Sequence, residues 1–212
     1  MTPTTTIPAA HFQKGRSEAI SLIVVHTTEN ACQPGVAQGV AGYFAHPPAG
    51  APVASSHYIV GPETLIQCVD EDDTAWHAAP VNHIGIGIEH TAYAHFTDAD
   101  WQGEQPQAML RRSAELVADI CFRAGIPAVF VDAEGLLRGD SGITFHATVS
   151  EACRLAIARK MTGTIWVSAQ HPASPISTHI DPGTAFPWDA YLAMVSAQLP
   201  AQASDPPPAE ST

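Results

Sequence analysis

The chain has 212 residues, 45% of them hydrophobic, which suits one well-cored globular domain with a tail. Acidic side chains outnumber basic ones by 21 to 9, and the net charge of −12 leaves no basic footprint for nucleic acid. No stretch approaches the roughly 20 apolar residues of a membrane span, and the amino terminus lacks the basic head and apolar core of a signal peptide. We therefore expect a protein made in the cytoplasm, without a nucleic-acid partner or membrane span.

Residues 1–18 are rich in Thr and Pro and predict an extended arm lying against the domain. Residues 20–25 follow as a nearly continuous apolar, β-branched run, which indicates a central strand covered on both faces. His26 ends this run, and an imidazole at the tip of a buried strand is held as rigidly as a metal ligand or catalytic base must be. Taken alone, such a histidine is more often a hydrogen-bonded strand end, so its partners decide its role.

Three local patterns come next. Residues 34–45 have helical apolar spacing with Pro near the first turn, and the Pro/Gly-rich residues 47–52 predict a loop that could line a cleft. Residues 55–60 and 65–69 are two short β-like runs separated by a turn, which predicts a hairpin.

A tryptophan and a histidine then stand together in a polar loop at Trp76 and His77. This pairing is typical of a groove that binds carbohydrate or peptide, although a tryptophan closing the edge of the core is an equal alternative. In residues 84–90, Ile alternates with Gly, and the glycines predict close backbone approach within a sheet. Glu89 comes at the end of this strand, where burial would raise its pKa; a solvated glutamate is the alternative.

The second half contains the strongest helix pattern, in residues 105–125, which closes with Gly125. Residues 128–131 predict a short strand, residues 141–146 another that ends at His146, and residues 150–160 a helix. A long connection leads to the segment THIDPG at 178–183 and a final helix to about residue 199, while the Pro-rich residues 200–212 predict a disordered tail. The cysteines form no CxxC pair, so we expect mostly buried thiols, with one disulfide as an alternative: Cys32, Cys68, Cys121 and Cys153.

Six segments together resemble one family. They are VVHTT around His26, SSHYIVG at 55–61, AWHA at 75–78, IGIGIEH at 84–90, ITFH ending at His146, and THIDPGTAFPW at 178–188. In this order they resemble the type 2 N-acetylmuramoyl-L-alanine amidases, zinc enzymes that share their fold with peptidoglycan-recognition proteins. The details are most similar to amidase domains of phage endolysins and actinobacterial cell-wall hydrolases. The resemblance covers roughly residues 20–198 and implies a single α/β domain at 19–199, with a central mixed β-sheet flanked by helices and a zinc cleft at the sheet edge.

The resemblance also implies a metal site. The family's two zinc histidines correspond to His26 and His146, and its third ligand corresponds to Asp181. One Zn²⁺ held by two imidazoles and a carboxylate keeps its fourth tetrahedral position for water, which is the open coordination of a catalytic site. The three ligands therefore favour hydrolysis over a purely structural metal.

The roles of the remaining site residues follow from the same resemblance. Glu89 corresponds to the general base and acid, and His179 takes the position of a group, often lysine in relatives, that stabilises the oxyanion. Histidine titrates near 6.5 when unperturbed, unlike lysine, and His179 could instead replace Asp181 as a ligand. The resemblance places the substrate-binding residues at three positions, with core or loop-capping roles as alternatives: Trp76, His77 and Asn82.

The implied reaction is cleavage of the amide bond between N-acetylmuramic acid and L-alanine of peptidoglycan, in an endolysin-like enzyme that reaches the cell wall through holin-type lysis. The net negative charge would be repelled by an anionic wall, so binding must rely on local groove contacts or on a partner. The alternatives are a zinc peptidase, an amidase that recycles soluble muropeptides, and a non-catalytic peptidoglycan-binding module. The oligomeric state is not predicted.

Overall fold

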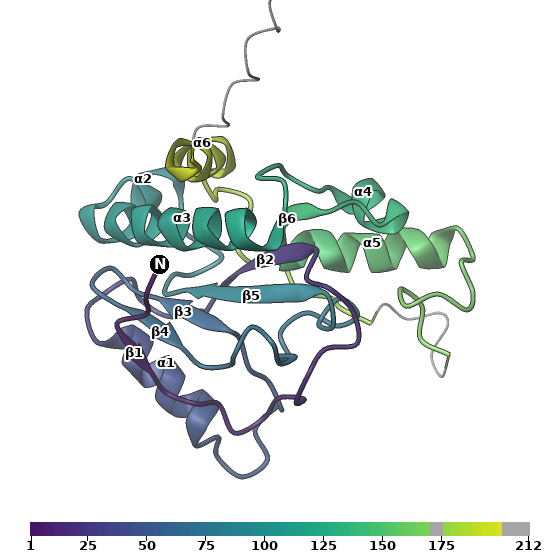
Figure 1. The fold of residues 1–212 in the computed structure, drawn as a ribbon, viewed down its shortest axis with the longest axis horizontal. Helices are drawn as coiled ribbons and strands as arrows, with labels where there is room; N and C mark the ends of the chain where they lie inside the picture. The colour runs from purple at the N-terminus through teal and green to yellow at the C-terminus, as the bar shows by residue number, and fades with distance from the viewer. Residues whose placement is uncertain (170–175, 201–212) are drawn as a thin grey trace, which may run out of the picture.

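A computed structural model describes residues 1–169 and 176–200 (Figure 1). Its centre is a six-stranded sheet in the order β1-β4-β3-β5-β2-β6. The strands are β1 Thr5–Thr6, β2 Leu22–Thr27, β3 Tyr58–Val60, β4 Leu65–Gln67, β5 Gly85–His90 and β6 Gly142–Phe145. The helices are α1 Val36–Ala45, α2 Asp98–Trp101, α3 Glu104–Ala124, α4 Ala133–Arg138, α5 His146–Ala158 and α6 Trp188–Gln198. Only β3 and β4 pair antiparallel, as the predicted hairpin, so the expected mixed α/β sheet is confirmed.

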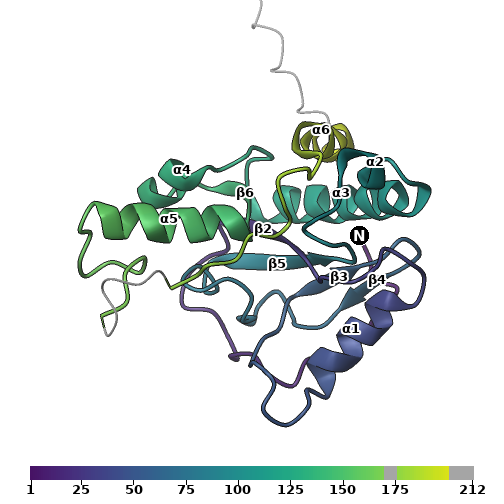
Figure 2. The ribbon, with the colours of Figure 1, turned by 180° about the vertical axis from the view of Figure 1, so that it is seen from behind.

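Strand β2 lies between two parallel neighbours, β5 and β6, and all six of its residues are buried. Successive side chains of a strand point to opposite faces of the sheet. Ile23 and Val25 accordingly pack with α3 and α6, whereas Leu22 and Val24 pack with α5. Figures 1 and 2 show α3 and α6 together over one face, with α1 on the other. The apolar run thus becomes the doubly covered central strand that its sequence predicts.

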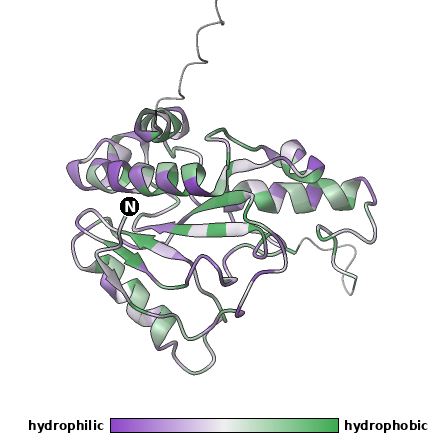
Figure 3. Cartoon of the chain, viewed as in Figure 1, coloured by the Kyte–Doolittle hydropathy of each residue, from purple (hydrophilic) through white to green (hydrophobic). Residues whose placement is uncertain are grey.

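Helix α3 matches the strongest helical pattern in the sequence. Its apolar stripe, which includes Met109, Leu116 and Ile120, is buried against the sheet. The helix ends at Gly125, whose φ of 68° is the left-handed conformation that glycine adopts readily, and whose N–H bonds to the carbonyl of Cys121. Figure 3 shows hydrophobic residues concentrated on the central strands, while the outer helices alternate between hydrophobic and hydrophilic residues.

The first residues of the chain form the edge of the sheet that lies opposite β6. Thr5 and Thr6 pair in parallel with β4, and Gln13 forms a bridge with Thr74. The guanidinium of Arg16 donates to the carbonyls of Asn82, His83 and Gly85, among others. The predicted tail lies outside the described residues from 201 onward.

Two predicted elements differ from the structure. Residues 128–131 form only one isolated bridge, Phe130 to Ile143, because Asp132 caps α4 by accepting from the N–H of Gly135 and turns the chain away from the sheet. The helix expected at 150–160 already begins at His146, since β6 runs directly into α5. All four cysteines are free and buried, and no helix within the described residues has the length and apolarity to cross a bilayer.

Candidate metal centre and active site

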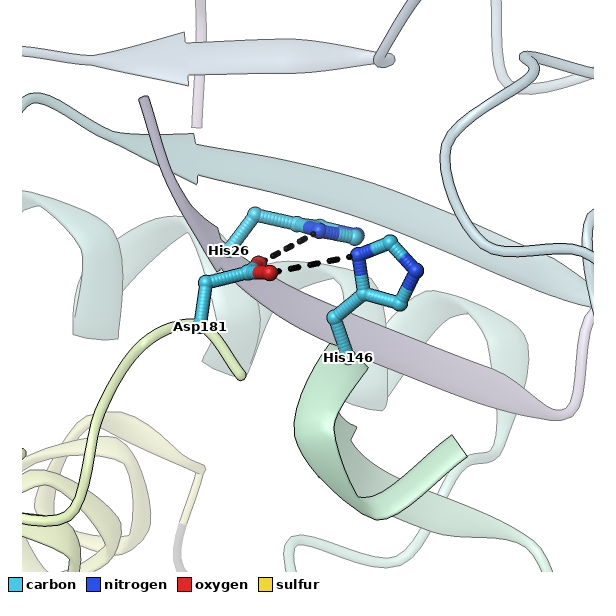
Figure 4. A group of neighbouring side chains, drawn as sticks. All are labelled: His26, His146 and Asp181. Atoms are coloured by element: carbon cyan, nitrogen blue, oxygen red, sulfur yellow. Dashed lines mark hydrogen bonds and ion pairs between the residues drawn. The ribbon is translucent and has the colours of Figure 1, made fainter. Parts of the chain in front are cut away.

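Three side chains that are distant in sequence meet at the carboxyl ends of β2 and β6. Asp181 Oδ2 lies 3.1 Å from Nδ1 of His26, and Asp181 Oδ1 lies 3.4 Å from Nδ1 of His146 (Figure 4). One potential ligand atom from each side chain falls within 4.8 Å of the other two, and all three residues are buried. Two imidazole nitrogens and a carboxylate oxygen are the donor set of a catalytic zinc site, so these residues fit Zn²⁺.

The fold explains why the three residues meet. Parallel pairing of β2 with β6 brings their carboxyl ends to the same edge, so His26 near the end of β2 faces His146, which follows β6. The loop that carries Asp181 is attached to this edge, because the N–H of Ala147 donates to the carbonyl of Asp181 at 2.9 Å. Gly183 closes the loop with φ of 90°, and a Cβ there would lie 1.9 Å from the carbonyl oxygen of Ala94.

Each histidine has a second partner on its outer nitrogen. His26 Nε2 lies 3.1 Å from Nδ1 of His77, and His146 Nε2 lies 3.1 Å from Oγ of Ser177. Ser177 is itself hydrogen-bonded to Ser150 at 2.7 Å. Partners of this kind fix the ring orientation and the tautomer of a metal-binding histidine, leaving Nδ1 free to face the metal. Neither serine has a local sequence pattern that would have identified it.

The carboxylate and the two imidazoles of the candidate site perturb one another's ionisation. Burial opposes ionisation of Asp181, but hydrogen bonds from His146, His179 and His26 outweigh it and hold the pKa of Asp181 far below its usual range. Burial likewise opposes a charged His26, yet its hydrogen bond to Asp181 and the negative charge of Glu89 leave its pKa raised. Burial lowers the pKa of His146 to about 4. The Asp181 carboxylate thus favours a positive charge beside it, which a metal ion bound by the three residues would supply.

Glu89 lies next to this centre. It pairs in register with His26 across β2 and β5, and its Oε2 atom is buried without a hydrogen-bond partner in the described part of the chain. Burial raises the pKa of Glu89 to about 7, an effect that the charge of His26 partly opposes. A carboxyl group near its half-protonated state at neutral pH can both accept and donate a proton.

A cleft of about 870 Å³ opens in front of these residues. One side carries the three candidate ligands and Glu89. Helix α1 contributes to the lining through Val36, Val40 and Tyr43, which the sequence pattern did not single out as site residues. Pro52 also lines the cleft, as expected for the loop at 47–52.

Comparison with known proteins identifies the family. Residues 16–184 match the model of the family described as N-acetylmuramoyl-L-alanine amidase. N-acetylmuramoyl-L-alanine amidase A of Achromobacter lyticus is 30% identical over 182 residues, which is 85% of each chain. The chain belongs to the N-acetylmuramoyl-L-alanine amidase family. It is thus a hydrolase that acts on peptidoglycan.

Solved structures of similar fold agree with this membership. A selenomethionine form of AmpD superposes with a TM-score of 0.53 at 18% identity, covering 94% of the amidase and 96% of that chain. A mutant endolysin from Bacillus subtilis superposes with a TM-score of 0.52 at 15% identity, covering 92% and 99%. At these identities the likeness concerns the fold alone.

His179 lies at the rim of the amidase cleft. Its side chain is 63% exposed, its ring stacks on that of His146 with centroids 3.9 Å apart, and its Nδ1 lies 3.5 Å from Oδ1 of Asp181. The carboxylate of Asp181 faces both buried histidines, whereas His179 faces the open cleft. This geometry favours Asp181 over His179 as the third metal ligand.

The two glycines of β5 make room for different neighbours. A Cβ on Gly85 would lie 3.0 Å from the carbonyl oxygen of Val81, which is the expected close backbone approach, whereas the space over Gly87 takes a side chain. A Cβ on Gly87 would lie 2.5 Å from Cγ of His77 and 2.8 Å from Oγ of Ser56. The missing side chain thus admits the imidazole of His77, which burial holds in its neutral form with a pKa well below the usual value. His77 also lines the cleft, so it contacts both the candidate ligand His26 and the open space.

The other two expected groove residues differ in their contacts. Oδ1 of Asn82 accepts from the backbone N–H groups of His77 and Ala78, at 3.0 and 2.6 Å, which is a loop-capping contact. Trp76 lies in the cleft wall, and its ring stacks near that of His11, with centroids 6.2 Å apart. Asn82 also lines the cleft.

Proposed function

We propose that the amidase binds one Zn²⁺ through His26, His146 and Asp181 and cleaves the amide bond between N-acetylmuramic acid and L-alanine of the stem peptide. The observation that carries this proposal is the convergence of two Nδ1 atoms and one carboxylate beside Glu89, whose Oε2 atom is buried. Zn²⁺ supplies Lewis acidity when bound, which acidifies water and polarises a carbonyl group. The remaining chemistry belongs to side chains of this chain.

We assign proton transfer to Glu89. In its ionised form the carboxylate accepts a proton from the attacking water, and in its protonated form it returns that proton to the leaving nitrogen of L-alanine. The C–N bond breaks, so the products are a lactyl carboxylate on the sugar and a stem peptide with a free amine. The raised pKa of about 7 supports this double role, because both forms are populated at neutral pH.

We assign stabilisation of the oxyanion to His179. Its exposed ring lies at the cleft rim and stacks face to face on the ring of His146. From there it is placed to donate to a substrate carbonyl oxygen that becomes negative during the reaction. Trp76 and His77 contribute to the substrate groove, and Asn82 maintains the loop that carries them.

We further propose a lytic role at the cell wall, with the enzyme reaching its substrate once holin-type lysis has breached the membrane. The endolysin-like fold supports this role. The alternative, recycling of soluble muropeptides, predicts cleavage of small fragments but little release of material from intact wall sacculi.

Digestion of purified peptidoglycan followed by mass spectrometry of the new ends tests the reaction. The expected products are free stem peptides that begin with the amine of L-alanine. New ends inside the stem would instead indicate a peptidase. The same digestion after dialysis against a chelator should lose activity and recover it with one equivalent of Zn²⁺ per chain.

A further inference from the structure

The positive side chains of this chain are all placed away from the cleft. Its nine Lys and Arg residues lie within the described ranges, and none is among the residues that line the cleft. Six of them are engaged elsewhere by carboxylates or backbone carbonyls: Lys14, Arg16, Arg112, Arg123, Arg138 and Arg159. Apart from a bound metal and the histidines, the cleft therefore offers no cation to a substrate.

Negative charge, in contrast, is present in the cleft. Glu29, Glu89 and Asp181 line it, and a bound metal ion would engage only the last of these directly. The carboxylate of Glu29 is held in place, because its Oε1 accepts from Oγ1 of Thr27 at 2.8 Å and from the N–H of Ala94 at 2.9 Å. A fixed carboxylate cannot swing away from an anionic group that enters the cleft.

Part of the cleft lining is apolar. Val36 and Val40 of α1 form part of it, together with Tyr43, which is 39% exposed, and Val53, which is 56% exposed. This surface suits the methyl groups of a stem peptide, whereas a carboxylate desolvated against it would lose hydration without gaining a partner.

We propose that this cleft selects stem peptides whose side-chain or α-carboxylates are capped as carboxamides over the corresponding free acids. The inference rests on the proposed function, since it assumes a stem peptide in the cleft, and it specifies the chemical class of that peptide. A carboxamide removes the repulsion from Glu29 and Glu89 and needs no cationic partner.

Two soluble muramoyl tetrapeptides test this inference if they differ only in whether the second stem residue carries a carboxamide or a free α-carboxylate. We expect kcat/KM to be about tenfold higher for the amidated peptide. A ratio of this size corresponds to one partly screened repulsion between a substrate carboxylate and a carboxylate of the cleft. Added salt should narrow the ratio, because it screens charges but does not change shape. A ratio of one, or a preference for the free acid, would overturn the inference. Cleavage of neither peptide would instead overturn the proposed function.

A pair of charge variants tests whether the preference for amidated peptides depends on charge in the cleft or on the net charge of the protein. Val53→Arg adds a cation at the cleft wall, and Val129→Arg adds one at a similarly exposed valine outside it, where 52% of the residue is accessible. We expect Val53→Arg to lower the ratio of kcat/KM between the amidated peptide and the free acid, because the free acid is cleaved faster. Val129→Arg should keep the parent ratio. Equal narrowing in both variants would show that net charge sets the preference and would contradict the assignment to the cleft.

Discussion

His26 and Glu89 are register partners on the adjacent parallel strands β2 and β5, so a candidate metal ligand and a candidate proton carrier occupy neighbouring positions on one face of the sheet. The sheet fixes this relationship more tightly than loops could, because both strands are buried and hydrogen-bonded along their length. The cost is a buried carboxyl group, whose Oε2 atom has no partner within the described residues.

The first prediction concerns Glu89→Gln. Since the pKa of Glu89 rises from 4.5 to about 7 on folding, the folded state binds the extra proton between these values, and its stability falls as pH rises through them. Metal-free Glu89→Gln should therefore be more stable than the parent above pH 7, by at most about 3 kcal/mol, and equally stable below pH 4.5. Urea unfolding of the metal-free parent and variant, once above pH 7 and once below pH 4.5, measures the difference in the free energy of unfolding.

The same variant should lose activity. Removing the proton carrier is expected to lower kcat about a hundredfold or more while leaving zinc content unchanged. Glu115→Gln, at an exposed position of α3, is the matched control and should change neither property. Full turnover by Glu89→Gln would remove Glu89 from the mechanism.

Sequence patterns predicted the elements that have a strong local code. The continuous β-branched run before His26 specifies a strand buried on both faces, and the two short runs around a turn specify the hairpin. The helical spacing of apolar residues specifies the buried stripe of α3. The ligand set required the family resemblance, because spacing alone does not show that His26, His146 and Asp181 meet.

The features that sequence did not predict depend on tertiary contacts. The space over Gly87 is filled by the ring of His77 from the loop that precedes β5. The role of Ser177 becomes visible only from its contact with His146. The apolar wall of α1 resembles an ordinary core-facing stripe until the cleft is seen. The strand expected at 128–131 was wrong because a helix cap at Asp132 competes with sheet pairing.

The second prediction concerns the three candidate metal ligands. His26→Ala, His146→Ala and Asp181→Ala should each reduce bound zinc well below one equivalent per chain, since each removes one of three protein ligands. Elemental analysis after dialysis against a weak chelator measures the content. Retention of one full equivalent by any of the three would contradict its assignment.

The third prediction concerns His179. His179→Ala should keep one equivalent of zinc, because the exposed ring stacks on His146 but contributes no atom to the three-residue ligand cluster. The variant should lower kcat about tenfold to a hundredfold with less effect on KM. His179→Lys should restore part of the lost kcat, since an ammonium group can also donate to an oxyanion. Loss of zinc in His179→Ala would instead make this residue a ligand.

The last prediction addresses the space above Gly87. A methyl group in Gly87→Ala would lie 2.5 Å from Cγ of His77, so the ring must move and withdraw its support from Nε2 of His26. We expect zinc affinity, measured by chelator competition, to fall about tenfold to a hundredfold, with a loss of stability of about 1 to 3 kcal/mol. Gly42→Ala is the matched control, because a methyl group there meets nothing within 4 Å and favours the helix. If Gly87→Ala lost stability but retained the parent zinc affinity, His77 would fill space without orienting His26.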